Sequence, residues 1–366
     1  GIIGYGKMGQ IRANAIEGGR HAEIATVFDT ARLPDCPYPY ASSAEEIIAD
    51  PSLDAVFVCT PNWLNRPLTI AGLRAGKHVF CEKPPCFNGT EMREIIGVER
   101  ECGRVLMYGF NHRHHGAILR MKEMVEEGEF GRILWMRGRY GKSVDGDYLK
   151  GWRADRNLAG GGILLDQGIH MLDLLLHLNG RPFDEVQAMV SNLYWKTPGI
   201  EDNVFALMRD SATGCAVSFH STMTQWRHLF SLEVFLERGY LTLNGLKTSS
   251  GTYGEEVLTI ARNRAKAPAA SFDSEEKIHF EVDASWQREV DAFFESVRTG
   301  SPVTYGSSAQ ALQVLDLIDR GEIDRLTLHH DREPVFLYPM LGERGWSCLS
   351  VEHLQGEVRI ELARDA

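Results

Sequence analysis

A glycine-rich turn near the start of the chain has the residue types that bind a phosphate group. Gly4, Gly6 and Gly9 form a G-x-G-x-x-G motif, with Lys7 and Met8 before the last glycine. The first glycine permits a tight turn, the second lets a pyrophosphate approach the backbone, and the third lets helix and strand pack closely. The N-terminus of the following helix would face the anion. All five residues are therefore candidates for binding a dinucleotide.

An acidic residue further along indicates which dinucleotide is preferred. Asp29 lies twenty residues beyond Gly9, at the end of the next predicted strand. A carboxylate there accepts hydrogen bonds from the adenosine ribose hydroxyls and repels a 2′-phosphate, so NAD is favoured over NADP. Arg32 nearby weakens that preference. The alternative is a strand–helix turn without a ligand, but strand, helix and acid together favour the cofactor.

Two more loops are expected at the same sheet edge, where open parallel sheets bind ligands. Thr60-Pro61-Asn62 follows one apolar run, and Glu82-Lys83 follows the next. The two prolines after Lys83 would hold it in place, and either X-Pro bond could be cis. The alternatives are an ordinary turn for the first loop and a solvated charge pair for the second.

A third stretch places a carboxylate and an imidazole at helical spacing. Asp166 and His170 are i and i+4, so they share one face of a helix. Three glycines at 160–162 precede them and would let the backbone come close to a ligand. Out of context, a helix cap and a buried structural histidine would be the preferred interpretation.

The elements that must position these residues fall into two patterns. Over residues 1–110, apolar runs alternate with helical segments, which predicts βαβ units and a parallel sheet. Strands are expected at 1–3, 24–28, 55–59, 78–81 and 105–108, and helices at 8–17, 43–49, 64–75 and 90–102.

Over residues 111–306, long strands follow one another, which predicts an α+β domain with a large, open, mainly antiparallel sheet. Strands are expected at 132–140, 185–195, 203–209, 214–225, 230–237 and 239–244, with flanking helices at 115–127, 166–178 and 285–299. A last helix is expected at 307–321. Residues 322–366 form an extension of unknown role, with strands at 326–329, 335–338 and 358–362.

Together these motifs resemble the Gfo/Idh/MocA oxidoreductases, a family that includes glucose–fructose oxidoreductase and inositol dehydrogenase. The likeness covers about residues 1 to 320 and rests on the glycine motif, Thr60-Pro61-Asn62, Glu82-Lys83-Pro84 and Asp166-x-x-x-His170. It implies a Rossmann domain followed by an antiparallel-sheet substrate domain, with 307–321 returning to the first domain.

The resemblance also implies that Lys83, Asp166 and His170 meet around the reacting carbon. Oxidising a secondary alcohol sends a hydride to the nicotinamide and a proton to a base, and an imidazole can take that proton near neutral pH. Asp166 would orient the imidazole or contact a substrate hydroxyl. Lys83, beside an oxidised nicotinamide, is expected to have a lowered pKa, so that it shares the proton transfer or polarises a carbonyl.

Six further residues are candidates for contacting the substrate. The resemblance implies this role for Asn111, Arg113 and the pair Trp152-Arg153, and Tyr140 and Tyr148 lie in the same region. Aromatic faces and charged donors suit a sugar ring or a sugar nucleotide. The alternative for the loop residues is a polar surface loop with one anchoring Trp. The three histidines at 112, 114 and 115 are expected on the pocket wall or the surface, because no carboxylate cluster supports a metal site.

Composition and charge exclude other classes of protein. The 366 residues carry a net charge of −11, which argues against binding nucleic acid. No apolar run approaches the ~18 residues that would span a membrane. The seven cysteines include no C-x-x-C, which indicates reduced thiols and a cytoplasmic location. No signal peptide is visible, and because the chain begins at Gly1 without Met, the presence of a preceding segment stays open.

The preferred interpretation is an NAD(P)-dependent dehydrogenase acting on a ring hydroxyl of a sugar, cyclitol or sugar nucleotide. Two alternatives stay open: an enzyme that recycles a tightly bound cofactor, and a non-catalytic regulator that senses a dinucleotide or a sugar. A homodimer or homotetramer through the open sheet face is expected, since large apolar faces usually meet a partner. The residues expected to supply that apolar surface, on one face or the other, are Val204, Ala206, Met208, Val217 and Phe219.

Overall fold

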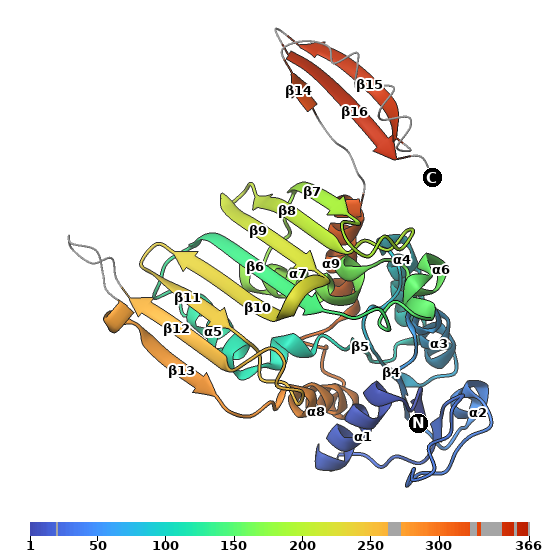
Figure 1. Ribbon diagram of the computed structural model, residues 1–366. Helices are drawn as coiled ribbons and strands as arrows, with labels where there is room; N and C mark the ends of the chain where they lie inside the picture. The colour runs from blue at the N-terminus through green and yellow to red at the C-terminus, as the bar shows by residue number, and fades with distance from the viewer. Residues whose placement is uncertain (20, 263–271, 323–327, 331–345, 355–356, 365–366) are drawn as a thin grey trace.

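Over its described residues, the computed structural model contains three β-sheets and the helices that pack on them (Figure 1). It describes residues 1–19, 21–262, 272–322, 328–330, 346–354 and 357–364. A five-stranded parallel sheet (sheet A) is followed by an eight-stranded, mainly antiparallel sheet (sheet B), which confirms the predicted fold class. Among the described residues, no helix is long and apolar enough to cross a membrane.

Sheet A has the strand order β2-β1-β3-β4-β5, with every pairing parallel. Its elements alternate as predicted: β1 (Ile2–Ile3), α1 (Lys7–Gly19), β2 (Val27–Phe28), α2 (Ala44–Ala49), β3 (Ala55–Val58), α3 (Asn62–Arg74), β4 (His78–Cys81), α4 (Gly89–Cys102) and β5 (Leu106–Tyr108). Most residues of β3 and β4 are buried, as expected of strands covered on both faces. The strand predicted at 24–28 keeps only its last two residues, because its neighbour β1 has only two residues to pair with.

Sheet B has the order β13-β12-β11-β10-β6-β9-β8-β7, and its β6–β9 pairing is parallel. The strands are β6 (Ile133–Ser143), β7 (Glu185–Ser191), β8 (Asn203–Asp210), β9 (Cys215–Thr222), β10 (Thr224–Leu236), β11 (Gly239–Asn244), β12 (Glu256–Arg262) and β13 (Glu276–Phe280). The predicted β8–β9 hairpin is confirmed. Strands β12 and β13 were not predicted, and the strand predicted at 214–225 is interrupted at Met223, between β9 and β10.

The helices of the second half do not all pack where the sequence placed them. Helices α5 (Gly116–Glu126) and α7 (Ile169–Asn179) pack on sheet B. Helix α8 (Ser285–Thr299) was expected there too, but it packs on α1 and on sheet A, where Phe293 contacts Phe57 and Phe80. Helix α9 (Ser308–Glu322) contacts α4 and β5 as well as α7 and β7. It therefore joins the two units of the fold, the first built on sheet A and the second on sheet B. The division of the chain into domains at residues 1–110 and 111–306, with 307–321 and 322–366 following, stays a prediction.

Side chains alternate between the two faces of sheet B. The five residues expected to supply apolar surface are all buried in the core: Val204, Ala206, Met208, Val217 and Phe219. Their strand neighbours point the other way. Met189, Phe205 and Leu207 are 67%, 48% and 62% exposed, so the open face is apolar through these residues.

A third sheet lies near the C-terminus. It contains β14 (Leu328–His330), β15 (Trp346–Leu354) and β16 (Glu357–Arg364), paired antiparallel in the order β14-β16-β15. The strands predicted at 326–329 and 358–362 overlap β14 and β16, and β15 was not predicted. The strand predicted at 335–338 lies outside the described residues.

A buried arginine connects three elements around sheet A. Arg12 of α1 donates from Nε to Glu82 Oε1 at 2.6 Å and from Nη1 to Glu289 Oε2 of α8 at 2.5 Å. Its guanidinium also lies over the rings of Phe80 and Trp286, at 4.4 and 4.8 Å from their centroids. One cation thus faces two carboxylates, and burial raises the pKa of Glu289 to about 8. The network ties α1 and α8 to the loop after β4.

Replacing Arg12 by Met should lower the free energy of unfolding by ~3–5 kcal/mol, because the buried Glu82 carboxylate would lose its counter-charge and Glu289 would lose its hydrogen-bond donor. Arg137→Met is the matched control, since Arg137 pairs with Glu233 at 2.6 Å with its side chain 48% exposed. That change should cost less than about 1 kcal/mol. Urea denaturation followed by circular dichroism measures both losses, and equal losses would contradict the role given to Arg12.

Candidate active site

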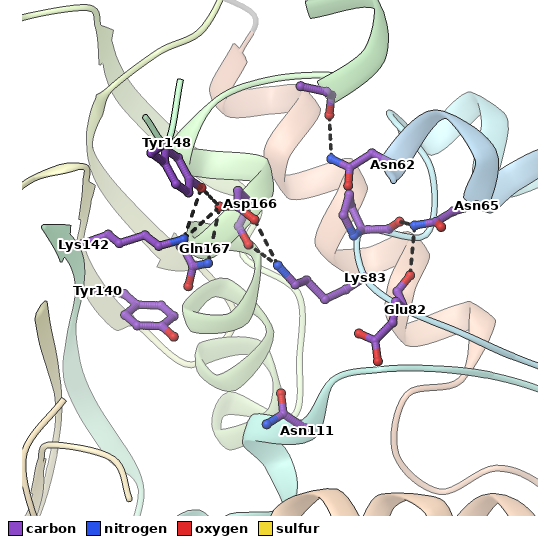
Figure 2. Close-up of polar contacts among 12 residues, drawn as sticks. Asn62, Asn65, Glu82, Lys83, Asn111, Tyr140, Lys142, Tyr148, Asp166 and Gln167 are labelled. Carbon is purple, nitrogen blue, oxygen red and sulfur yellow. Dashed lines mark hydrogen bonds and ion pairs between the residues drawn. The ribbon is translucent and has the colours of Figure 1, made fainter. Parts of the chain in front are cut away.

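A lysine that follows β4 meets an aspartate from the second unit (Figure 2). Lys83 Nζ donates to Asp166 Oδ1 at 3.2 Å and to the Asp166 backbone oxygen at 2.5 Å. The two residues are 83 positions apart in the chain. The fold therefore brings together residues that sequence analysis connected only through a family resemblance.

The Asp166 carboxylate is also held from its other side. Lys142, near the end of β6, lies with Nζ 3.6 Å from Asp166 Oδ2 and 3.2 Å from the Tyr148 hydroxyl, which itself donates to Oδ2. Burial alone would raise the pKa of the Asp166 carboxyl. Lys83, Lys142 and the Tyr148 hydroxyl outweigh burial and hold that pKa well below its usual range. Asp166 is therefore ionised at neutral pH.

The side chain of His170, four residues after Asp166, is neutral. Its buried ring stacks on His112 with the centroids 3.9 Å apart, and His112 Nε2 shares a hydrogen bond with the Tyr140 hydroxyl at 3.0 Å. Burial, and then the charge of Lys83, lower the pKa of His170 well below its usual value. His170 Nδ1 is buried without a hydrogen-bond partner in the described part of the chain. A neutral imidazole with a free nitrogen is a form that can accept a proton.

The backbone before α7 is wound more widely than the sequence predicts. Asp166 lies in a π-helical turn (Leu164–Gly168), and the regular helix begins only at Ile169. The buried Glu201 accepts from the backbone N–H groups of Gly162 at 2.7 Å and Leu164 at 2.9 Å, which satisfies donors at the start of this turn. A Cβ on Gly162 would lie 2.1 Å from the Glu201 carbonyl oxygen. This glycine is therefore required by chain packing, whatever ligand its neighbours approach.

A buried asparagine holds the loop that carries Lys83. Asn65 of α3 donates from Nδ2 to the backbone oxygens of Glu82 at 3.2 Å and Pro84 at 2.8 Å. The Thr60 hydroxyl donates to Asn65 Oδ1 at 3.0 Å. The Lys83–Pro84 peptide bond is cis. The predicted loops after β3 and β4 are thus hydrogen-bonded through one residue that the sequence analysis did not single out.

The glycine-rich turn has the predicted close approach of strand and helix. Gly4 has a φ of +92°, and a Cβ on Gly9 would lie 2.1 Å from the Gly4 carbonyl oxygen. The Asp29 carboxylate lies beside this turn, with Oδ2 4.0 Å from where a Cβ of Gly6 would stand. Next to them are the first two residues of α1, Lys7 and Met8. A helix N-terminus, a bare glycine backbone and an acidic side chain together fit a dinucleotide.

A small pocket lies beside Asp166, between α3 and the loop before the π-helical turn. Its lining includes Asn62, Tyr148, Trp152, Arg153, Gly161 and Gly162. The Arg153 guanidinium stacks on the Trp152 ring at 4.2 Å, and Trp152 packs edge-on against Trp63 of α3. Asn62, which follows the helix cap Pro61, donates to the Ala159 carbonyl oxygen at 2.8 Å. Residues predicted from both halves of the sequence therefore meet here.

Other predicted residues point elsewhere. The Glu82 carboxylate accepts from Arg12 Nε inside the core. Arg113 forms a two-point ion pair with Asp173, at 2.6 and 2.7 Å, with both side chains buried. Asn111 is buried away from Asp166, as Figure 2 shows, and its amide donates to Ser285 Oγ at 3.4 Å. A guanidinium in a protein core needs a carboxylate partner, which explains where Arg113 points.

One residue of the site, Lys142, was not expected from sequence. Lys142 carried a signal that could have identified it, because it lies two positions after Tyr140 and strand side chains repeat every two residues. His112 was expected on the pocket wall or the surface, and it is buried against His170. Across the described residues, no group of three or more His, Cys, Asp or Glu side chains is arranged to hold a metal ion.

Solved structures of other proteins have the same fold. A levoglucosan dehydrogenase, solved with NADH and levoglucosan, superposes with a TM-score of 0.74 at 23% identity, covering 88% of this chain and 96% of that one. That likeness shows the fold. Among curated proteins, 1,5-anhydro-D-fructose reductase from Ensifer adhaerens is 38% identical over 186 residues, and levoglucosan dehydrogenase from Pseudarthrobacter phenanthrenivorans is 37% identical over 152 residues.

These two alignments span 50% and 41% of this chain, and only 54% and 39% of the relatives' own lengths. Family models cover more of the chain. The family described as "Oxidoreductase family, NAD-binding Rossmann fold" matches residues 1–110, and the "GFO/IDH/MocA C-terminal domain" matches residues 118–242. Because both halves match one family in the expected order, the chain belongs to the Gfo/Idh/MocA family of oxidoreductases.

Proposed function

We propose that this chain is an NAD-dependent dehydrogenase that oxidises a ring secondary alcohol of a sugar, cyclitol or sugar nucleotide. The observation that carries this proposal is the contact of Lys83 with Asp166, one turn of helix from the neutral His170. Relatives named as a sugar reductase and a sugar dehydrogenase support the substrate class. A regulator that only senses a ligand would not need this set of proton-transfer groups.

The proposed roles follow from the charge state of each group. When bound, the nicotinamide supplies the hydride acceptor. His170 accepts the hydroxyl proton, because its ring is neutral and can therefore take one. Lys83 stabilises the oxygen of the reacting carbon, and the ionised Asp166 holds the Lys83 ammonium in place. Tyr140, Trp152 and Arg153 are proposed to contact the substrate ring or the cofactor.

The preference for NAD rests on Asp29. Its carboxylate accepts from the Ala31 backbone N–H at 2.9 Å and stands beside the glycine-rich turn. There it would accept the ribose hydroxyls and repel a 2′-phosphate. Arg32 is the nearby cation that weakens this preference. Its guanidinium lies over the Tyr40 ring, 5.2 Å from the ring centroid.

Assembly and location are proposed from two observations, an apolar sheet face and unpaired cysteines. The exposed Met189, Phe205 and Leu207 make one face of sheet B apolar, and a second copy of the chain would cover it. The cysteines whose side chains are described are all unpaired, and three of them, Cys81, Cys86 and Cys215, are buried. Free buried thiols are typical of a reducing compartment, so a cytoplasmic location is proposed.

The first test is NAD reduction, followed at 340 nm, against aldoses, inositols and nucleotide sugars. Lys83→Ala should lower kcat by roughly 10²–10⁴-fold and leave NADH binding intact. Lys277→Ala is the matched control, because Lys277 lies on the edge strand β13 with its side chain 53% exposed. Equal turnover in Lys83→Ala and the parent would remove Lys83 from the mechanism.

Cofactor choice tests the role of Asp29. Asp29→Asn should lower the ratio of kcat/KM with NAD to kcat/KM with NADP by roughly tenfold to a hundredfold, since a charge-assisted hydrogen bond is worth ~1.5–3 kcal/mol. Asp35→Asn, a change at an exposed carboxylate of the same connecting segment, serves as the control. A parent enzyme that uses NADP better than NAD would contradict the proposed preference.

Light scattering coupled to size exclusion tests the assembly. Leu207→Lys should raise the dissociation constant of the oligomer at least about tenfold, because a charge would be buried in an apolar contact. Val282→Lys places the same charge on a residue that is 75% exposed and lies outside the strands of sheet B. A parent chain that is monomeric at micromolar concentration, or a Val282→Lys variant that dissociates equally, would refute this interface.

A further inference from the structure

The site holds more positive charge than its own residues neutralise. Lys83 and Lys142 bind opposite oxygens of one carboxylate, that of Asp166. Both lysine side chains are mostly buried, with 15% and 20% of their surfaces exposed. Arg153 adds a third cation, and its Nε is buried without a hydrogen-bond partner in the described part of the chain. Two lysines therefore share one carboxylate, and a third cation stands near it.

The neighbouring groups do not supply the missing negative charge. Burial lowers the pKa of both His112 and His170 well below the usual value, so both rings are neutral. Burial likewise raises the pKa of Tyr140 well above its ordinary value, which keeps the hydroxyl protonated. Glu82, the nearest acidic residue in sequence to Lys83, is committed to Arg12. A bound anion would compensate the excess cation.

Lys142 is the cation best placed to receive that anion. Figure 2 shows Lys83 and Lys142 approaching Asp166 from opposite sides, Lys83 from the loop after β4 and Lys142 from β6. Lys83 belongs to the side where the nicotinamide and the reacting carbon would lie. The Lys142 ammonium lies over the Tyr148 ring, 4.2 Å from its centroid, and within the described residues its other polar contacts are Tyr148 Oη and Asp166 Oδ2. It therefore retains capacity for a substrate oxygen.

We propose that the substrate carries an anionic group, a carboxylate or a phosphate ester, and that Lys142 binds it while Lys83 acts at the reacting carbon. This inference rests on the proposed dehydrogenase function and narrows its substrate class. It does not require Arg153 to bind the same group, because the Arg153 side chain lines the neighbouring pocket and stacks on the Trp152 ring. Burial lowers the pKa of Lys142, as expected for an ammonium whose counter-charge is incomplete.

Matched trios of substrates test the proposal: glucose, glucuronate and glucose 6-phosphate, and the corresponding galactose and mannose compounds. For at least one trio, kcat/KM should be roughly tenfold to a hundredfold higher for one anionic member than for the neutral sugar. A ratio of that size corresponds to the free energy of one charge-assisted hydrogen bond. Preference for the uronate identifies a carboxylate, and preference for the phosphate identifies a phosphate ester. Lys142→Gln should abolish that ratio, and Lys142→Arg should retain most of it.

Lys150→Gln is the matched control, because Lys150 lies in the same loop region with a side chain that is 77% exposed. NADH binding to each variant, measured by fluorescence, shows that the fold is intact. Turnover of neutral sugars without preference for an anion, or an equal loss on both kinds of sugar in Lys142→Gln, would overturn this inference and leave the dehydrogenase standing. Turnover of no compound in the trios by a chain that binds NADH would overturn this inference alone, because the proposed dehydrogenase is tested separately against inositols and nucleotide sugars.

Discussion

The contact between Lys83 and Asp166 is the interaction on which the candidate site depends. Each residue comes from a different unit of the fold, so the pair forms only when the two units are packed together. A buried carboxylate is costly unless cations and donors surround it, and Asp166 has Lys83, Lys142 and Tyr148. Because the whole arrangement is anchored at one carboxylate, a shift of either unit would separate the groups that are proposed to react.

Packing beneath the site explains how that contact is held. Arg12 joins α1, the loop after β4 and α8 through two carboxylates, and Asn65 fixes the backbone on both sides of Lys83. Helix α9 contacts elements of both units. The turn that is proposed to bind the dinucleotide and the lysine that is proposed to act beside it therefore rest on one connected network. Such a network positions a long, flexible side chain without binding its ammonium directly.

Neighbouring groups in the site also differ in their charge. Asp166 is ionised because cations surround it, and His170 is neutral because burial and the same cations oppose its protonation. A carboxylate that stays charged and an imidazole that stays neutral can hold a lysine and accept a proton at the same pH. The π-helical turn places Asp166 one wide turn ahead of His170, and turns of this kind are frequent at functional sites.

Local signals were enough to predict the alternating first half and the antiparallel second half of the chain, because glycine spacing and hydrophobic period are read over short stretches of sequence. The family resemblance singled out Lys83, Asp166 and His170 as one site, and their roles stay a proposal. Tertiary structure decided the rest. Arg113 and Glu82 have the residue types of ligand contacts, yet each is taken by a buried partner far away in the chain, Asp173 and Arg12. Lys142 enters the site because β6 runs past Asp166, and α8 covers sheet A because Phe293 fits against Phe57 and Phe80. Which of several charged or apolar residues meet is set by long-range packing, and no local pattern in the chain encodes it.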